Sequence, residues 1–158
     1  MLHLAFLLLI PAVVAIALLD VVLRTVLGSS VWWSTEDNMP VRLMLSTLYL
    51  SEAPLSTQSP IPLHGTPDQV FLSRRGQLLL VDTKVRGRHR VDQADIIQLS
   101  VYRVILAHTQ GSRPVARFGY IRTVTPNAPS RHRVRYHKVR LLPERTVVSL
   151  HQAQVGVR

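Results

Sequence analysis

The sequence of 158 residues contains no cysteine. These residues therefore form no disulfide, no thiolate zinc site and no cysteine-ligated iron–sulfur cluster. Acidic residues are also scarce, with 9 Asp and Glu against 19 Lys and Arg and a formal net charge of +10. Residues 41–158 hold 18 of these basic side chains and only 6 of the acidic ones. This imbalance predicts a polyanionic partner, either nucleic acid or an anionic membrane surface.

Formal charge is absent from the side chains of residues 1–19, which are almost all apolar. An apolar run of about 20 residues is long enough to span a bilayer. We therefore predict a transmembrane helix over residues 1–23, followed by a polar juxtamembrane linker over residues 24–43. A cleaved signal peptide is the alternative, with "GSS" at 28–30 as its cleavage site. It is disfavoured because no basic residue precedes the apolar run.

The basic residues near this segment predict its orientation. Arg24 and Arg42 follow the segment, and no Lys or Arg precedes it. The positive-inside rule then places the N-terminus outside and the C-terminal domain in the cytoplasm. A reporter fused to the C-terminus is expected to give a cytoplasmic signal.

From residue 44 onward, the pattern of apolar and turn residues predicts one α/β domain over residues 44–158. Residues 41–52 fit a helix or a strand equally well. Two strands around a turn with Gly76 are followed by a helix that Asp92 and Asp95 cap. The apolar stripe of that helix comprises Ile97, Val101, Val104 and Ile105. The expected elements are strands at 68–73, 78–85, 115–125 and 131–142, and helices at 93–108 and 143–154.

Three charged residues gather around the predicted hairpin. Asp82 and Lys84 lie two positions apart in the strand "LLLVDTKV", so their side chains share a face. Asp68 begins the preceding strand, and the hairpin can bring it beside Asp82 if the register allows. Two neighbouring carboxylates suit a Mg²⁺ or Mn²⁺ ion, and a lysine beside them can act on a water molecule. A plain salt bridge between Asp82 and Lys84 is the alternative.

The ordered set "Gly65-Thr66-Pro67-Asp68" and "Asp82-Thr83-Lys84", with 13 residues between the two stretches, resembles the signature of the PD-(D/E)XK nuclease superfamily. The following helix resembles that of the RecB-like branch, because Gln98 and Tyr102 lie one turn apart on one face. The resemblance covers roughly residues 44–152. It implies a restriction-endonuclease-like mixed sheet flanked by helices, here preceded by one transmembrane helix.

This resemblance also implies an activity, namely hydrolysis of DNA phosphodiesters with Mg²⁺ or Mn²⁺ and without an iron–sulfur cluster. Asp68, Asp82 and the backbone carbonyl of Thr83 would hold the metal, and Lys84 would act on the attacking water. Gln98 and Tyr102 would hold DNA phosphate or orient the lysine. A further metal ligand found upstream in many relatives could only be Glu52 or His64.

The basic segments 86–90 and 131–140 are the expected DNA contacts, and they would bind phosphates without reading the base sequence. His132 and His137 lie among them and are expected to meet phosphate or solvent. Two other functions stay open: an inactive nuclease-fold module that tethers DNA to the membrane, and a basic protein of the membrane surface. The predicted phosphate contacts are Arg86, Arg88, Arg90, Arg131, Arg133, Arg135 and Lys138.

Overall fold

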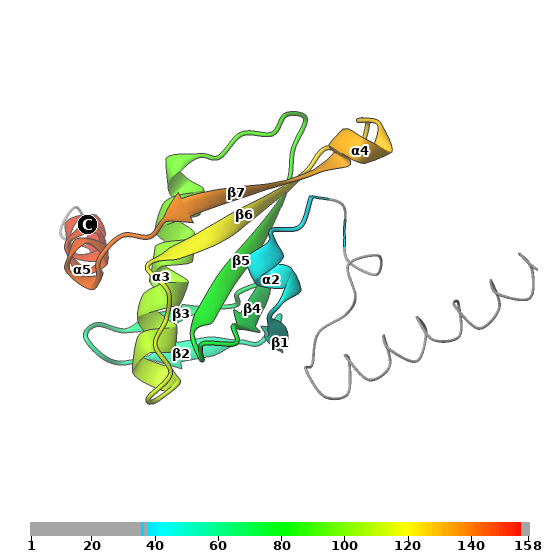
Figure 1. Ribbon diagram of the computed structural model, residues 1–158. Helices are drawn as coiled ribbons and strands as arrows, with labels where there is room; N and C mark the ends of the chain where they lie inside the picture. The colour runs from blue at the N-terminus through cyan, green and yellow to red at the C-terminus, as the bar shows by residue number, and fades with distance from the viewer. Residues whose placement is uncertain (1–35, 37, 156–158) are drawn as a thin grey trace, which may run out of the picture.

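The computed structural model describes Glu36 and residues 38–155, and the predicted transmembrane helix lies outside them. None of the helices it describes combines the length and the apolar character needed to cross a bilayer. The described part is a mixed five-stranded sheet with helices on its two faces (Figure 1). The mixed α/β architecture is the one expected from the sequence.

The central sheet has the order β1-β4-β5-β6-β7. Only β5 and β6 run parallel, and the other neighbours are antiparallel. The long connection between β5 and β6 contains α3, as parallel neighbours require. A separate two-stranded sheet pairs β2 with β3. The strands are β1 (Thr47–Ser51), β2 (Leu55–Thr57), β3 (Leu63–Gly65), β4 (Gln69–Leu72), β5 (Leu78–Val85), β6 (Phe118–Val124) and β7 (Val134–Arg140).

Four helices accompany the strands. The long helix α3 begins after Asp92, whose backbone N–H donates to the Asp95 carboxylate at 2.8 Å, so the predicted capping box is confirmed. Only part of its predicted apolar stripe is buried, because the helix turns Leu99 and Tyr102 toward the sheet and leaves Ile97 and Val101 partly exposed. The helices are α2 (Val41–Met44), α3 (Gln93–Thr109), α4 (Ser130–Arg133) and α5 (Glu144–Val155).

Alternate residues of β5 divide the core into two clusters. Leu78 and Leu80 face α3 and α5, whereas Leu79 and Val81 face α2 on the other side of the sheet. The strand is buried on both faces over its first five residues, as its continuous apolar run predicts. Its last residues therefore emerge from the core at one end of the sheet.

Several boundaries differ from the sequence prediction; β6, for example, begins at Phe118 rather than at residue 115. The last predicted strand begins at Val134 rather than at residue 131, because the chain after Pro129 forms the single turn α4. Residues before position 44, where the domain was predicted to begin, also pack against the sheet. Leu43 is buried in the cluster on the α2 side, and Glu36 is bound to the sheet through Arg122.

Candidate active site

Near the end of β5, the alternation of side chains places Asp82 and Lys84 on the sheet face that α3 covers. Asp82 is 1% exposed, and its Oδ2 lies 2.9 Å from Nζ of Lys84. The two atoms form an ion pair by distance, but no well-aligned hydrogen bond reaches Oδ2 within the described residues. The predicted shared face is confirmed. The site thus contains a buried carboxylate oxygen that pairs with the Lys84 ammonium and accepts no hydrogen bond among the described residues.

Asp68 enters the same site from the start of β4. The register pairs Gln69 with Val81, so one further step places Asp68 opposite Asp82. Oδ2 of Asp68 accepts the backbone N–H of Thr83 at 2.6 Å. The antiparallel hairpin therefore brings both carboxylates together, as the sequence suggested it could.

A chain of polar contacts leads from the strand to α3. Nζ of Lys84 donates to Oε1 of Gln98 at 2.8 Å, and Nε2 of Gln98 donates to the hydroxyl of Tyr102 at 2.8 Å. The i, i+4 spacing of Gln98 and Tyr102 puts both side chains on the helix face that meets β5. The lysine ammonium is consequently held between a carboxylate and an amide oxygen.

Gly65 is required by the position of Tyr102. A Cβ atom at residue 65 would overlap the Tyr102 ring, so only glycine lets β3 approach α3 this closely. This contact gives the glycine of "GTPD" a packing role. It also holds the Tyr102 ring, which is buried, in place beside Gln98.

Burial dominates the electrostatics of Asp82. Burial raises the pKa of its carboxyl group, and the nearby charges of Asp68 and Asp95 raise it further, whereas Lys84 opposes them. The raised pKa reports a carboxylate whose negative charge is incompletely balanced. A cation at this position would relieve that imbalance.

The donors present fit a Mg²⁺ or Mn²⁺ ion. Such ions accept one or two protein carboxylates and fill the remaining positions with water and substrate phosphate. Asp68 and Asp82 supply the carboxylates, and Oδ2 of Asp82 has no hydrogen bond to lose. No group of three His, Asp or Glu side chains that could hold a metal occurs among the described residues.

The two proposed additional ligands lie at the margin of this site. Glu52 donates its backbone N–H to the Asp68 carbonyl at 3.0 Å, with its own backbone at a φ of 49°. Its side chain is exposed. His64 is exposed on β3, next to buried Leu63. Neither residue joins the two carboxylates in a metal-binding group.

Arg86 and Arg90 do not have the free guanidinium groups that the sequence suggested. Arg86 lies 2.7 Å from buried Asp95 and 3.1 Å from Asp92, and Arg90 lies 2.8 Å from Asp92. These pairs tie the connection after β5 to the first turn of α3. Burial alone would raise the pKa of Asp95, but the Asp92 N–H and the Arg86 guanidinium outweigh it and lower that pKa.

The other predicted phosphate contacts divide between the two faces of the sheet. Lys138 lies 4.4 Å from the centre of the Phe118 ring on the α2 side, which is the opposite face of the sheet from Asp82. Arg88, Arg133 and Arg135 are exposed. Arg88 lies in the connection after β5, Arg133 ends α4 and Arg135 lies at the start of β7, at the end of the sheet that carries Lys84. The side chain of Arg131 lies outside the described part.

A histidine pair beside Lys84 was missed by sequence reasoning. Thr123, the register partner of Lys84, is buried and contacts Nδ1 of His89 at 2.7 Å and Nε2 of His137 at 3.0 Å. Nε2 of His89 lies 2.6 Å from the His132 carbonyl, which only accepts, so that nitrogen carries a proton. His137 is therefore bound within the fold rather than directed to phosphate or solvent. The separation of 34 positions between His89 and Thr123 hid this contact from local patterns.

No protein-family model matches the sequence, and no curated protein sequence matches it. Among solved structures, the chain is similar to the "Crystal structure of SSO0001", with 15% sequence identity and a TM-score of 0.44. That match covers 89% of this chain and 55% of the other, so the chain spans about half the length of that protein. At this level of similarity the match carries no argument about function.

Proposed function

We propose that the chain is a membrane-anchored DNA nuclease that depends on a divalent metal and faces the cytoplasm. The observation that carries the proposal is the contiguous set of contacts from Asp68 through Thr83 and from Asp82 through Lys84 to Gln98 and Tyr102. A simple salt bridge between Asp82 and Lys84 would not require a second carboxylate or the two polar residues on the facing helix.

Each side chain has a role in this reaction that follows from its position. Asp68 and Asp82 would hold Mg²⁺ or Mn²⁺, with the Thr83 carbonyl alongside, and the ion would supply positive charge to the phosphodiester oxygens. Lys84 would position a water molecule for attack on phosphorus and, as the neutral amine, would accept the proton that this water loses. Gln98 would fix the direction of the ammonium group through its amide oxygen.

Exposed arginines at the same end of the sheet would position the DNA backbone. Arg88, Arg133 and Arg135 are exposed there, and guanidinium groups bind phosphate in a fork-like geometry. Contacts of this kind are independent of base sequence and weaken with salt. We therefore expect cleavage to slow with rising salt and to show no defined recognition sequence.

The direct test incubates the full chain in detergent with plasmid and with single-stranded DNA, in Mg²⁺, in Mn²⁺ and in EDTA. The proposal expects cleavage with either metal, none with EDTA, and none from Asp82→Ala or Lys84→Ala variants with unchanged circular dichroism. A folded Lys84→Ala variant with wild-type turnover would remove the lysine from the mechanism. A variant lacking residues 1–33 is expected to cleave DNA as well.

One observation favours a second function, that of an inactive module that tethers DNA to the membrane. The Lys84 ammonium already forms an ion pair with Asp82, and no third acid or histidine joins the two carboxylates within the described residues. An inactive module that tethers DNA to the membrane would retain such a site as a structural ion pair. Metal-independent DNA binding without cleavage in any of the conditions above would support this function over the nuclease.

A further inference from the structure

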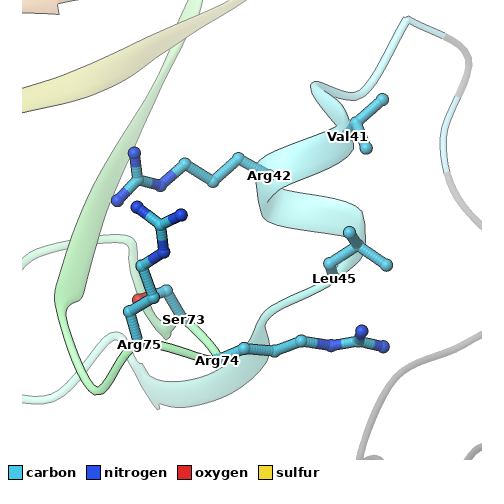
Figure 2. A pocket seen from close by; sticks show the side chains of 6 residues that line it. All are labelled: Val41, Arg42, Leu45, Ser73, Arg74 and Arg75. Carbon is cyan, nitrogen blue, oxygen red and sulfur yellow. The ribbon is translucent and has the colours of Figure 1, made fainter.

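An arginine-rich hollow lies on the other end of the domain, between α2 and the turn that joins β4 to β5 (Figure 2). Its volume is about 490 Å³. Arg42 and Arg75 extend to the same side of the hollow, whereas Arg74 extends past Leu45 in the other direction. The lining residues are Val41, Arg42, Leu45, Ser73, Arg74 and Arg75.

The positive charge of this hollow is not balanced by any acid in the described part. Arg42 donates to the neutral amide of Gln77 at 2.7 Å and lies 4.8 Å from the Phe118 ring centre. Within the described residues, the side chains of Arg74 and Arg75 form no hydrogen bond or ion pair. Guanidinium groups gathered without a carboxylate are a suitable arrangement for binding phosphate.

Exposed aliphatic side chains lie in and near the same hollow: Val41 and Leu45 line it, and Leu48 follows on β1, paired with Phe71 of the cluster on the α2 side. Val41 is 68% exposed, Leu45 43% and Leu48 49%. They are three of the five large hydrophobic side chains exposed in the described part. A DNA backbone offers little to aliphatic side chains, whereas a bilayer surface presents phosphates beside acyl chains. The combination therefore favours a lipid surface over nucleic acid.

The place of the hollow in the chain agrees with this choice. The turn of Arg74 and Arg75 precedes β5, whereas Asp82 and Lys84 lie near the far end of the same strand. Val41 also follows, along the chain, the apolar segment over residues 1–23 that is predicted to cross the membrane. A domain resting on this end would leave the candidate active site directed away from the bilayer.

We propose that Val41, Arg42, Leu45, Leu48, Arg74 and Arg75 form a docking face for an anionic leaflet, with a phospholipid phosphate between Arg42 and Arg75. The proposal does not depend on the nuclease activity, because it uses none of the active-site residues. Each basic residue near an anionic surface strengthens the contact by roughly fivefold. The three arginines together are therefore expected to favour the docked state by roughly a hundredfold.

Hydrogen exchange of the full chain in nanodiscs tests this face. The backbone N–H groups of Arg74 and Arg75 have no acceptor among the described residues, so they exchange quickly unless the face is covered. Exchange at Arg74, Arg75 and residues 41–45 should slow markedly when phosphatidylglycerol is added to phosphatidylcholine. High salt should reverse the effect, because it shortens the reach of the surface charge to about 3 Å at 1 M.

Two double variants, one on the docking face and one outside it, change the net charge of the chain by the same amount. Arg74→Glu/Arg75→Glu should abolish the slowing by anionic lipid, whereas Arg88→Glu/Arg145→Glu, at exposed positions outside this face, should retain it. Equal exchange in both lipid mixtures for the wild-type chain would overturn the proposal. Slowing by a short DNA duplex in phosphatidylcholine nanodiscs, with none by anionic lipid, would also overturn it and assign the face to nucleic acid. These lipid results do not depend on whether the protein cleaves DNA, so a failure of the proposed nuclease activity would not change them.

Discussion

Replacing Lys84 by methionine removes the ammonium group but keeps a long, largely apolar side chain. The variant leaves the nearly buried Asp82 carboxylate without its cation and the Gln98 amide oxygen without its donor. Breaking a buried ion pair on one side costs about 3–5 kcal/mol. Because the Lys84 side chain is 23% exposed and Asp82 can take up a proton, we expect about 2 kcal/mol. That loss corresponds to a fall in melting temperature of about 8 °C.

The Asp82→Asn change separates the structural role of the lysine from its proposed catalytic role. An amide at residue 82 needs no cation, so Lys84→Met/Asp82→Asn should recover most of the stability that Lys84→Met loses. The double variant should remain inactive, because both the metal ligand and the lysine are gone. Lys84→Met alone is expected to lose about 10²–10⁴-fold in cleavage rate, the usual contribution of a positioned acid or base.

The assay combines thermal unfolding in EDTA with initial cleavage rates in Mg²⁺, both measured on the full chain in detergent. Lys84→Arg is the control, because it retains the positive charge near Asp82. If the double variant is as unstable as Lys84→Met, the carboxylate is not the cause of the instability. If Lys84→Met is folded and cleaves DNA at the wild-type rate, the lysine has no part in catalysis.

Three further results are expected. Asp82→Asn alone should leave the metal-free protein equally stable or more stable at neutral pH. The raised pKa of Asp82 means that folding favours the protonated acid, so wild-type stability falls as pH rises through the folded pKa. A lower melting temperature of Asp82→Asn in EDTA would contradict this reasoning. Burial and the charges of Arg135 and His89 lower the pKa of His137, so stability should rise with pH between that lowered pKa and 6.5, and His137→Gln should remove this rise from the unfolding curves. The full chain should stay with membranes after a carbonate or high-salt wash, whereas release into the supernatant would exclude a spanning helix over residues 1–23.

The elements that carry the candidate site were predictable because their signals are local. The apolar run of β5, the turn at Gly76 with its φ of 73° and the capping box of α3 each depend on residues close in sequence. The side-chain alternation of a strand then placed Asp82 and Lys84 together. The hairpin register that brings Asp68 to Thr83 was left open, because it depends on which side chains the core buries.

The parts that were missed depend on contacts between distant segments. Prolines at 54, 60 and 62 obscured the pairing of β2 with β3, since they interrupt the alternation that identifies strands. The basic run after β5 suggested free phosphate contacts, but Asp95 holds Arg86 through a pairing that only the docked helix creates. The contact of Thr123 with His89 and His137 likewise requires the folded sheet.

Glu36 fixes the chain that leads from the predicted membrane helix to the sheet, directly behind the site. Its carboxylate accepts from Nε of Arg122 at 2.7 Å and from the Tyr136 hydroxyl at 2.6 Å, and the Arg122 guanidinium lowers its pKa. Arg122 is the register partner of Thr83, whose N–H binds Asp68 from the neighbouring strand. The same backbone segment of β5 is therefore held by Asp68 on one side and by the Glu36-bound strand β6 on the other. Because both contacts bear on Thr83, we expect the Glu36 contact to help hold the candidate metal site in place without touching it.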